Sequence, residues 1–264
     1  MSIVYGPVPS WRLGRSLGID LLSARGKICS FDCIYCQLGR TTQATAERRV
    51  FVETAQLRAE LERLPDIGVD TVTFSGTGEP TLAANLGEAL DLVCDWPALR
   101  GVPTAVLTNA SLLSQPDVRR NLARADMVVA KLDAPDEALF RAINHPVAGM
   151  TWAGVVGGIR ALRREFAGHL ALQMMFVAAN RDQAAVMAEL ARSLAPDEVQ
   201  LNTPLRPSPA PPLDRAAMAE IEAAFAGLPV QNVYAAPQPA ATPLDEAEMR
   251  RRRPAEGARE VSGK

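Results

Sequence analysis

Short apolar segments alternate with helical segments through most of the 264-residue chain, and this alternation restricts the fold more than any other feature. Buried strands are predicted at residues 17–22, 71–74, 104–107, 127–132, 170–177 and 199–202. Helical periodicity occurs at residues 54–64, 82–93, 116–123, 152–166, 183–194 and 214–225. Because parallel strands are usually joined through helices, the pattern predicts an α/β protein with a parallel sheet, either a barrel or an open doubly wound sheet.

The length of the chain suits one such domain. We expect residues 1–230 to form it, beginning with a Pro- and Gly-rich lead-in before the first strand. Residues 231–264 are Pro- and Ala-rich and end in an arginine run at 250–253 and a polar tail. We expect this C-terminal extension to end in a mobile arginine-rich tail.

Composition excludes several classes of protein. With 28 basic and 30 acidic residues, the molecule as a whole lacks the positive field that drives nonspecific nucleic-acid binding. Four cysteines, three of them within eight residues, do not resemble the disulfide framework of a small secreted domain. The sequence shows neither a signal peptide nor an apolar stretch long enough to span a bilayer. We therefore expect a cytoplasmic protein with no membrane partner.

Three cysteines, Cys29, Cys33 and Cys36, follow the first predicted strand. Thiolates are soft ligands that suit iron–sulfur clusters or zinc, and one short loop can wrap several of them around a metal centre. A structural zinc site or an electron-transfer cluster usually has four protein ligands. Three ligands would leave one iron of a cubane cluster open to a small molecule.

A fourth ligand is not evident in the sequence. Cys94 lies near the end of a predicted helix and is interpreted as a small buried hydrophobe. His145 and His169 lack ligand spacing. A zinc site and a sensor cluster nevertheless remain as alternatives, and either would require a fourth protein ligand close in space.

A glycine-rich segment follows the second predicted strand and contains Gly76, Gly78 and Glu79. The glycines let the main chain approach a ligand closely, and a carboxylate complements an ammonium group. Such a run taken alone usually marks a turn. Its position one strand–helix unit after the cysteines places it at the same edge of the sheet, where α/β enzymes build their sites.

Polar residues also follow the third and fourth predicted strands. Asn109 comes after the third strand, and Lys131 and Asp133 end the fourth. Asn109 could equally cap a turn, and Lys131 and Asp133 could form a solvated ion pair. In the lead-in, Arg12 and Arg15 could hold a substrate phosphate or carboxylate, or could instead fix the N-terminus over the barrel.

The cysteine spacing and the glycine-rich segment together resemble the radical S-adenosylmethionine (SAM) superfamily. The resemblance implies a [4Fe-4S] cluster on Cys29, Cys33 and Cys36. It also places an aromatic residue, here Tyr35, against the adenine of SAM. The SAM-binding residues that it implies or makes available are Tyr35, Gly76, Gly78, Glu79, Asn109, Lys131 and Asp133.

A finer resemblance rests on five segments, and it is to bacterial relatives of the tRNA demethylwyosine (wybutosine) synthases. The segments are YGPVPSWRLGRSLGIDL (5–21), SGTGEPTL (75–82), LTNASLL (107–113), KLDA (131–134) and LNTPLRP (201–207). It implies a partial (β/α)6 barrel with parallel strands. It also implies reductive cleavage of SAM to methionine and a 5′-deoxyadenosyl radical that abstracts hydrogen from a substrate.

The resemblance leaves the substrate and the type of enzyme, oxidoreductase or transferase, open. We expect a reducing partner such as flavodoxin or ferredoxin, and RNA is one candidate substrate. A basic patch near the cluster could serve RNA, and its candidate members are Arg12, Arg15, Arg40, Arg48 and Arg49. The alternatives to an enzyme are an iron–sulfur redox sensor and a zinc-stabilised binding protein.

Overall fold

The computed structural model describes residues 1–237 and 239–252 of the chain. The strands of the main sheet are β1 (Val4–Ser10), β2 (Gly14–Ile19), β5 (Thr71–Phe74), β6 (Thr104–Thr108), β7 (Met127–Lys131), β8 (His169–Met175), β9 (Glu198–Asn202) and β10 (Val230–Asn232). They are paired in that order. From β2 to β10 all neighbours are parallel, whereas β1 runs antiparallel to β2. Two short strands, β3 (Lys27–Cys29) and β4 (Thr41–Ala44), form a separate parallel pair.

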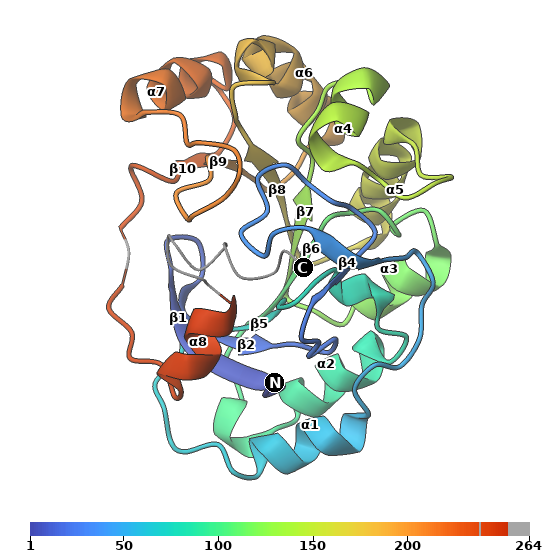
Figure 1. Ribbon diagram of the computed structural model, residues 1–264, viewed down its shortest axis with the longest axis vertical. Coiled ribbons are helices and arrows are strands. Elements are labelled where there is room, and N and C mark those ends of the chain that lie inside the picture. The colour runs from blue at the N-terminus through green and yellow to red at the C-terminus, as the bar shows by residue number, and fades with distance from the viewer. Residues whose placement is uncertain (238, 253–264) are drawn as a thin grey trace, which may run out of the picture.

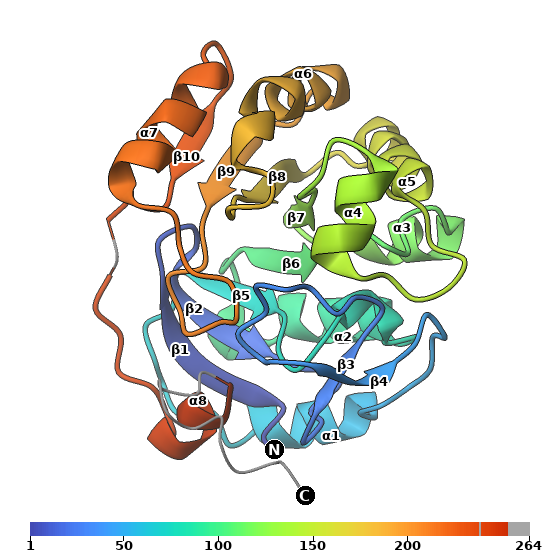
Figure 2. The ribbon, with the colours of Figure 1, turned by 45° about the horizontal axis from the view of Figure 1, so that its top comes forward.

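The helices lie around the outside of the curled sheet (Figures 1 and 2). They are α1 (Thr54–Leu61), α2 (Leu86–Cys94), α3 (Pro116–Leu122), α4 (Glu137–Asn144), α5 (Trp152–Glu165), α6 (Ala184–Leu194), α7 (Arg215–Ala224) and α8 (Glu246–Arg252). None of these described helices is long and apolar enough to cross a bilayer. The edge strands β1 and β10 are not paired with each other, so the sheet forms a half-barrel.

The predicted partial barrel is confirmed, and all six predicted strands are present as β2 and β5 to β9. Two further strands extend the sheet at its edges. The lead-in forms β1, whose register shifts between Tyr5 and Val8, where Gly6 and Pro7 interrupt the pattern. Proline is tolerated in an edge strand because the N–H that it lacks is not needed by a second neighbour. At the other edge, β10 crosses the expected boundary between residues 230 and 231.

The arginine-rich end differs from the expected mobile tail over residues 250–252, which belong to α8. Arg252 is 3 % exposed, and its guanidinium lies 4.2 Å from the centre of the Tyr5 ring. It forms ion pairs with Asp20 at 3.3 Å and with Glu248 at 2.7 Å. These contacts tie α8 to β1, since a buried arginine is stable only when its charge is paired. The rest of the expected tail lies outside the described residues.

Periodic apolar residues fix the outer helices against the sheet. In α2, Leu86, Leu90 and Val93 follow the spacing of one helical face, and all three are buried. Burial of a leucine side chain of this kind contributes about 2 kcal/mol. The strands and helices thereby hold the carboxyl ends of the parallel strands at one edge, where the cysteine loop lies.

Candidate active site

The cysteine loop begins where β3 ends. Cys29 is the last residue of β3, and Cys33 and Cys36 follow in the loop. The loop is held by α4, because Ile34 N donates to the carbonyl oxygen of Ile143 at 3.0 Å. Sequence periodicity did not predict α4, although this helix positions the loop.

The thiols fit an iron–sulfur cluster as a donor set. Cys29 is buried, and Cys33 and Cys36 are partly buried. Burial raises the pKa of Cys29 to about 12 and that of Cys33 to about 11. Among the described residues, no three His, Cys, Asp or Glu side chains converge closely enough to hold a metal ion. In a cubane cluster each thiolate binds a different iron, whereas a zinc site gathers its ligands around one ion.

Lys27 places a buried positive charge beside these thiols. It lies two residues before Cys29 in β3, a spacing that puts both side chains on the same face of a strand. Its side chain is 3 % exposed, and its Nζ forms an ion pair with Asp32 at 3.7 Å. Burial disfavours the charged form, but the thiolates of Cys36, Cys29 and Cys33 outweigh it and raise the pKa of Lys27. A buried ammonium group beside the thiols is suited to compensate an anionic cluster held by three thiolates.

The glycine-rich segment packs directly against β3 and β2. A Cβ atom at Gly78 would overlap the carbonyl oxygen of Ile28, and one at Gly76, where φ is +143°, would overlap the Asp20 carboxylate. Thr77 N donates to Asp20 Oδ2 at 3.0 Å, and Ile28 N donates to Thr77 O at 3.0 Å. Glycine is therefore required at both positions by close approach of the main chain.

Glu79 is enclosed rather than open to a ligand. It is 2 % exposed, and Oε1 accepts hydrogen bonds from Thr81 N at 3.1 Å, Thr81 Oγ1 at 2.6 Å and Thr108 Oγ1 at 2.6 Å. Oε2 accepts from Asn109 N at 2.7 Å. Burial raises the pKa of Glu79, and these hydrogen bonds oppose the rise. Oε2 accepts only this one bond from the described residues, but burial separates Glu79 from the cavity, so the direct contact with the SAM ammonium that the sequence suggested is not prepared in this geometry.

Asn109 faces the cysteine loop. Its Nδ2 donates to Ser30 Oγ at 2.9 Å and makes a longer contact of 3.5 Å with Cys29 Sγ. Its Oδ1 accepts from Ser111 N at 3.0 Å. In this geometry Asn109 orients the loop and supplies an N–H group to a ligating sulfur, in addition to any contact with SAM.

Lys131 and Asp133 do not form the solvated pair that was one interpretation of the sequence. Asp133 is 3 % exposed and lies 3.3 Å from Lys131 Nζ. The Tyr35 hydroxyl donates to Asp133 Oδ2, as does Asn144 Nδ2 at 2.9 Å, and Met175 N donates to Oδ1 at 2.9 Å. Asp133 thus fixes the Tyr35 ring and the end of β8 rather than facing a ligand.

Asn144, the last residue of α4, joins this network to the cysteines. Its Nδ2 lies 3.4 Å from Cys33 Sγ and 3.2 Å from the Tyr35 hydroxyl oxygen. Its contribution depends on α4 and on a contact between residues far apart in the chain. No pattern within the sequence could have revealed it.

A cavity of about 350 Å³ opens inside the half-barrel beside the cysteine loop. Of the proposed cluster and SAM residues, Tyr35, Cys36, Gly76, Gly78 and Lys131 line it. The three other candidates for SAM contact do not line it; these are Glu79, Asn109 and Asp133. The main chain of the glycines and the face of Tyr35 are therefore the groups best placed to receive a bound molecule.

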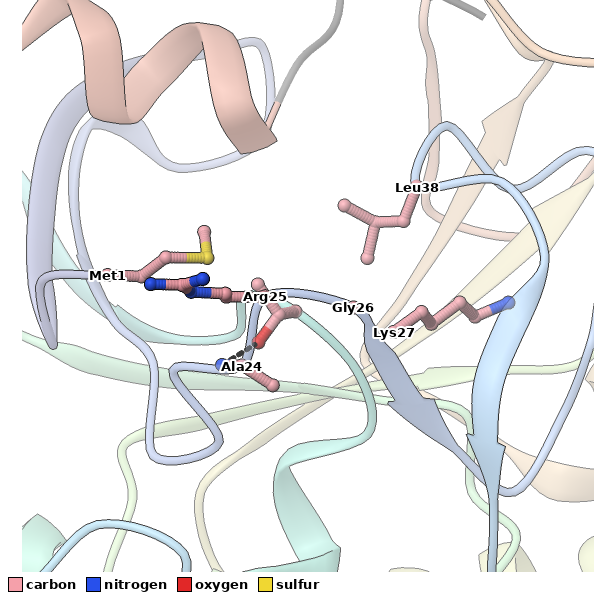
Figure 3. A pocket seen from close by; sticks show the side chains of 7 residues that line it. Met1, Ala24, Arg25, Gly26, Lys27 and Leu38 are labelled. Atoms are coloured by element: carbon pink, nitrogen blue, oxygen red, sulfur yellow. Dashed lines mark hydrogen bonds between the residues drawn. The ribbon is translucent and has the colours of Figure 1, made fainter. Parts of the chain in front are cut away.

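A second hollow, of about 470 Å³, lies beside the start of β3, and none of the cysteines lines it. Figure 3 shows Met1, Arg25 and Leu38 around this hollow, with the Lys27 ammonium directed away from it. Cys36, the glycines and Tyr35 instead line the cavity inside the half-barrel, which we take as the candidate active site.

The arginines considered as a basic patch are mostly neutralised. Three form ion pairs: Arg15 with Asp70, Arg40 with Asp32 and Arg48 with Asp117. The Arg49 guanidinium lies 4.7 Å from the centre of the Phe51 ring. Arg12 alone of the five lines the cavity.

The prediction that Cys94 is buried is wrong. Cys94 is exposed, because the buried face of α2 ends with Val93 and the next residue turns outward. His145 adopts a left-handed conformation at the end of α4, and His169 begins β8, at the opposite edge of the sheet from the cysteine loop. His145 contacts the loop through its main chain, since its carbonyl oxygen accepts from Asp32 N at 3.2 Å; among the described residues, neither histidine belongs to a group of side chains that could hold a metal ion.

Comparisons with solved structures agree with the fold. Streptococcus suis SuiB bound to S-adenosylmethionine aligns with 81 % of this chain and 50 % of its own, with a TM-score of 0.59 and 16 % identity. A radical SAM methyltransferase from Sphaerobacter thermophilus aligns with 82 % of this chain and 65 % of its own, with a TM-score of 0.60 and 17 % identity. At these identities the similarity shows the half-barrel fold alone.

Comparisons of sequence establish the family. The UPF0026 protein slr1464 of Synechocystis sp. is 45 % identical over 210 residues, which are 78 % of this chain and 77 % of that protein. The UPF0026 protein MJ1312 of Methanocaldococcus jannaschii is 36 % identical over 78 % of this chain and 65 % of its own. These relatives give no support to the finer resemblance to wybutosine synthases. The sequence model of the radical SAM superfamily matches residues 24–191, and the chain therefore belongs to that superfamily, with UPF0026 proteins as its relatives.

Proposed function

We propose that this protein is an enzyme that holds a [4Fe-4S] cluster on Cys29, Cys33 and Cys36 and reductively cleaves SAM there. One observation carries the proposal. The ammonium group of Lys27 is buried and its charge interacts with all three thiols, one of which, Cys36, lines the same cavity as the glycine-rich segment. A bound cluster and SAM would supply a 5′-deoxyadenosyl radical that abstracts hydrogen from the substrate.

The residues of this chain would bind and orient the cluster and SAM. Lys27 compensates negative charge, and Asn109 and Asn144 direct N–H groups at the sulfurs of Cys29 and Cys33. The main chain at Gly76 and Gly78 approaches the cavity closely enough to receive the amino group of SAM.

The aromatic side of the cavity is fixed separately. The Tyr35 ring, held by Asp133 and with Lys131 Nζ 4.9 Å from its centre, would pack against adenine. Burial of these groups limits the access of water, which protects a reactive radical.

The electron donor and the cellular setting remain predictions. Cluster reduction requires an external one-electron donor, for which we propose a flavodoxin or a ferredoxin in the cytoplasm. RNA as a substrate draws no support from the arginines, since three of the five candidates are paired with carboxylates. Oxidoreductase and transferase chemistry are both compatible with radical formation.

The test is anaerobic reconstitution with iron and sulfide, reduction with dithionite, and chromatographic detection of 5′-deoxyadenosine from added SAM. Cys33→Ala removes a ligand. Cys94→Ala is the matched control, because Cys94 is exposed at the end of α2 and lies outside the site. We expect 5′-deoxyadenosine from the wild type and from Cys94→Ala, and none from Cys33→Ala.

Two other outcomes would point to the alternatives. A loaded cluster with all its irons ligated by the protein, and with a spectrum that SAM does not change, would indicate a redox sensor. A protein that binds zinc tightly and fails to assemble a cluster would indicate a zinc-stabilised binding protein. Either result would remove the enzymatic proposal.

A further inference from the structure

The turn between β1 and β2 directs an arginine into the active-site cavity. Trp11 and Arg12 lie in this turn and line the cavity, and the Arg12 guanidinium carbon lies 5.3 Å from the centre of the Trp11 ring. Ser10 Oγ accepts hydrogen bonds from Arg12 N at 3.3 Å and from Leu13 N at 3.2 Å, which fixes the turn. Arg12 therefore projects from a rigid support rather than from a mobile loop.

A second arginine reaches the same cavity from the opposite edge of the half-barrel. Arg206 lies in the loop after β9, and its Nη1 donates to Gln37 Oε1 at 2.7 Å, beside Cys36. Figures 1 and 2 both show the turn between β1 and β2 next to this loop, on the open side of the sheet. The two arginines thus approach each other across the gap between the two sheet edges.

The charges that line the cavity are all positive. Its basic residues are Arg12, Lys131, Arg206 and Arg252, and among the described residues no aspartate or glutamate lines it. Lys131 is paired with Asp133, and Arg252 is paired with Asp20. Neither Arg12 nor Arg206 has a carboxylate partner within the part of the chain that the structure describes.

The position of the Arg12 guanidinium group is electrostatically unfavourable in the absence of a bound anion. Its Nε and Nη1 atoms are buried and make no hydrogen bond to the described residues. Burial, together with the nearby charge of Arg206, lowers the pKa of Arg12 to about 10, and Glu198 only partly offsets this. Arg12 still carries its charge at neutral pH. Unsatisfied buried donors next to a second cation are unfavourable unless a bound anion receives them.

We propose that the cavity takes a substrate bearing an oxyanion, either a carboxylate or a phosphate, which binds between Arg12 and Arg206 on the open side of the half-barrel. This inference rests on the proposed function, because it names the class of molecule that the radical would attack. A guanidinium group offers a planar fork of donors that matches either oxyanion. Anchored there, a small anionic substrate has the rest of its length inside the cavity, toward Tyr35 and the glycines.

Anion binding can be measured on the reconstituted protein without reductant. Orthophosphate and, separately, acetate are titrated at constant ionic strength, with chloride as the reference anion. Two readouts are followed: tryptophan fluorescence, to which Trp11 beside Arg12 contributes as the one of the three tryptophans that lines the cavity, and the melting temperature. Arg12→Gln and Arg206→Gln each remove one guanidinium group. Arg15→Gln is the matched control, since Arg15 lies on the same hairpin but pairs with Asp70 outside the cavity.

We expect a saturable response to phosphate or acetate, with the stronger of the two identifying the substrate's anionic group. Arg12→Gln and Arg206→Gln should each weaken the affinity about tenfold or more, and Arg15→Gln should not change it. Arg206 is exposed, so its variant tests the proposal even if Arg12→Gln fails to fold.

A response no different from that of chloride, or titration curves unchanged in both cavity variants, would overturn the inference. Since no turnover is involved, that result would leave SAM cleavage standing. Conversely, absence of 5′-deoxyadenosine would count against the proposed function while leaving the anion site measurable.

Discussion

Thr108→Val tests whether Glu79 is an ionised, internally bonded carboxylate. Thr108 Oγ1 donates to Glu79 Oε1 at 2.6 Å and accepts from Ala110 N at 3.0 Å, and Thr108 is 1 % exposed. Valine keeps the shape of the side chain but removes both bonds. A hydrogen bond to a charged group is worth about 2 kcal/mol and an unsatisfied buried N–H costs about 1 kcal/mol more. We expect a loss of about 3 kcal/mol when Glu79 is ionised.

The loss should depend on pH in a defined direction. The folded-state pKa of Glu79 is raised above its ordinary value of 4.5, so the folded protein holds this proton more tightly than the unfolded chain. The contribution of Glu79 to stability therefore falls as pH rises above that value. Removing the Thr108 donor raises the pKa of Glu79 further. The deficit of the variant should be about 2 kcal/mol while Glu79 is protonated, because two uncharged bonds are lost, and should grow to about 3 kcal/mol as Glu79 ionises.

The assay is urea unfolding of both proteins by circular dichroism at about pH 5 and about pH 8. Thr203→Val is the matched control. Thr203 is also buried, donates to Phe176 O at 2.9 Å and accepts from Leu213 N at 2.8 Å, so its partners are uncharged. It should lose about 2 kcal/mol at both pH values. An equal deficit for Thr108→Val at both pH values would refute the account of Glu79.

Three further substitutions probe the cysteine loop. Lys27→Met should lower the cluster reduction potential by on the order of 100 mV, because it removes a buried positive charge; an EPR-monitored redox titration with an unchanged midpoint would contradict this. Gly78→Ala should abolish cluster incorporation, measured as bound iron, because its Cβ overlaps Ile28 O, whereas Gly157→Ala, with open space at its Cβ, should load normally. Asn144→Ala should lower the cluster reduction potential and reduce the melting temperature by about 5 °C, because the side chain connects Cys33 with Asp133. Wild-type values of both quantities would show that this connection is unimportant.

The central strands were predictable from sequence because each contains a short apolar or β-branched segment, and most lie between helical segments. Strand β1 and helix α4 were not predictable in this way. β1 contains Gly6 and Pro7, which suppress a strand signal, and it exists because β2 offers it an edge. α4 spans eight residues, and its formation depends on packing against the cysteine loop and α5 as well as on local propensity.

The residues of the site also divide into those that the sequence reveals and those that it does not. The spacing of the three cysteines can be recognised from the sequence alone: Cys29, Cys33 and Cys36. The partners of Asp133 cannot, because Tyr35 lies 98 residues away in the chain and meets it only when β7 and the loop come together. Lys27 had a local signal, its two-residue spacing from Cys29 in a strand, but interpreting it required knowing that this short segment is extended.

The acidic residues of the site share one physical role. Asp20, Glu79 and Asp133 are at most 3 % exposed, and each accepts hydrogen bonds from the main chain of a neighbouring segment. A buried carboxylate must be satisfied in this way, so these side chains fix the loops and turn their negative charge away from the cavity. The cavity is left with glycine main chain, an aromatic face and cations, of which Arg12 and Arg206 have no carboxylate partner among the described residues. A site arranged in this way is prepared for a molecule that brings its own negative charge.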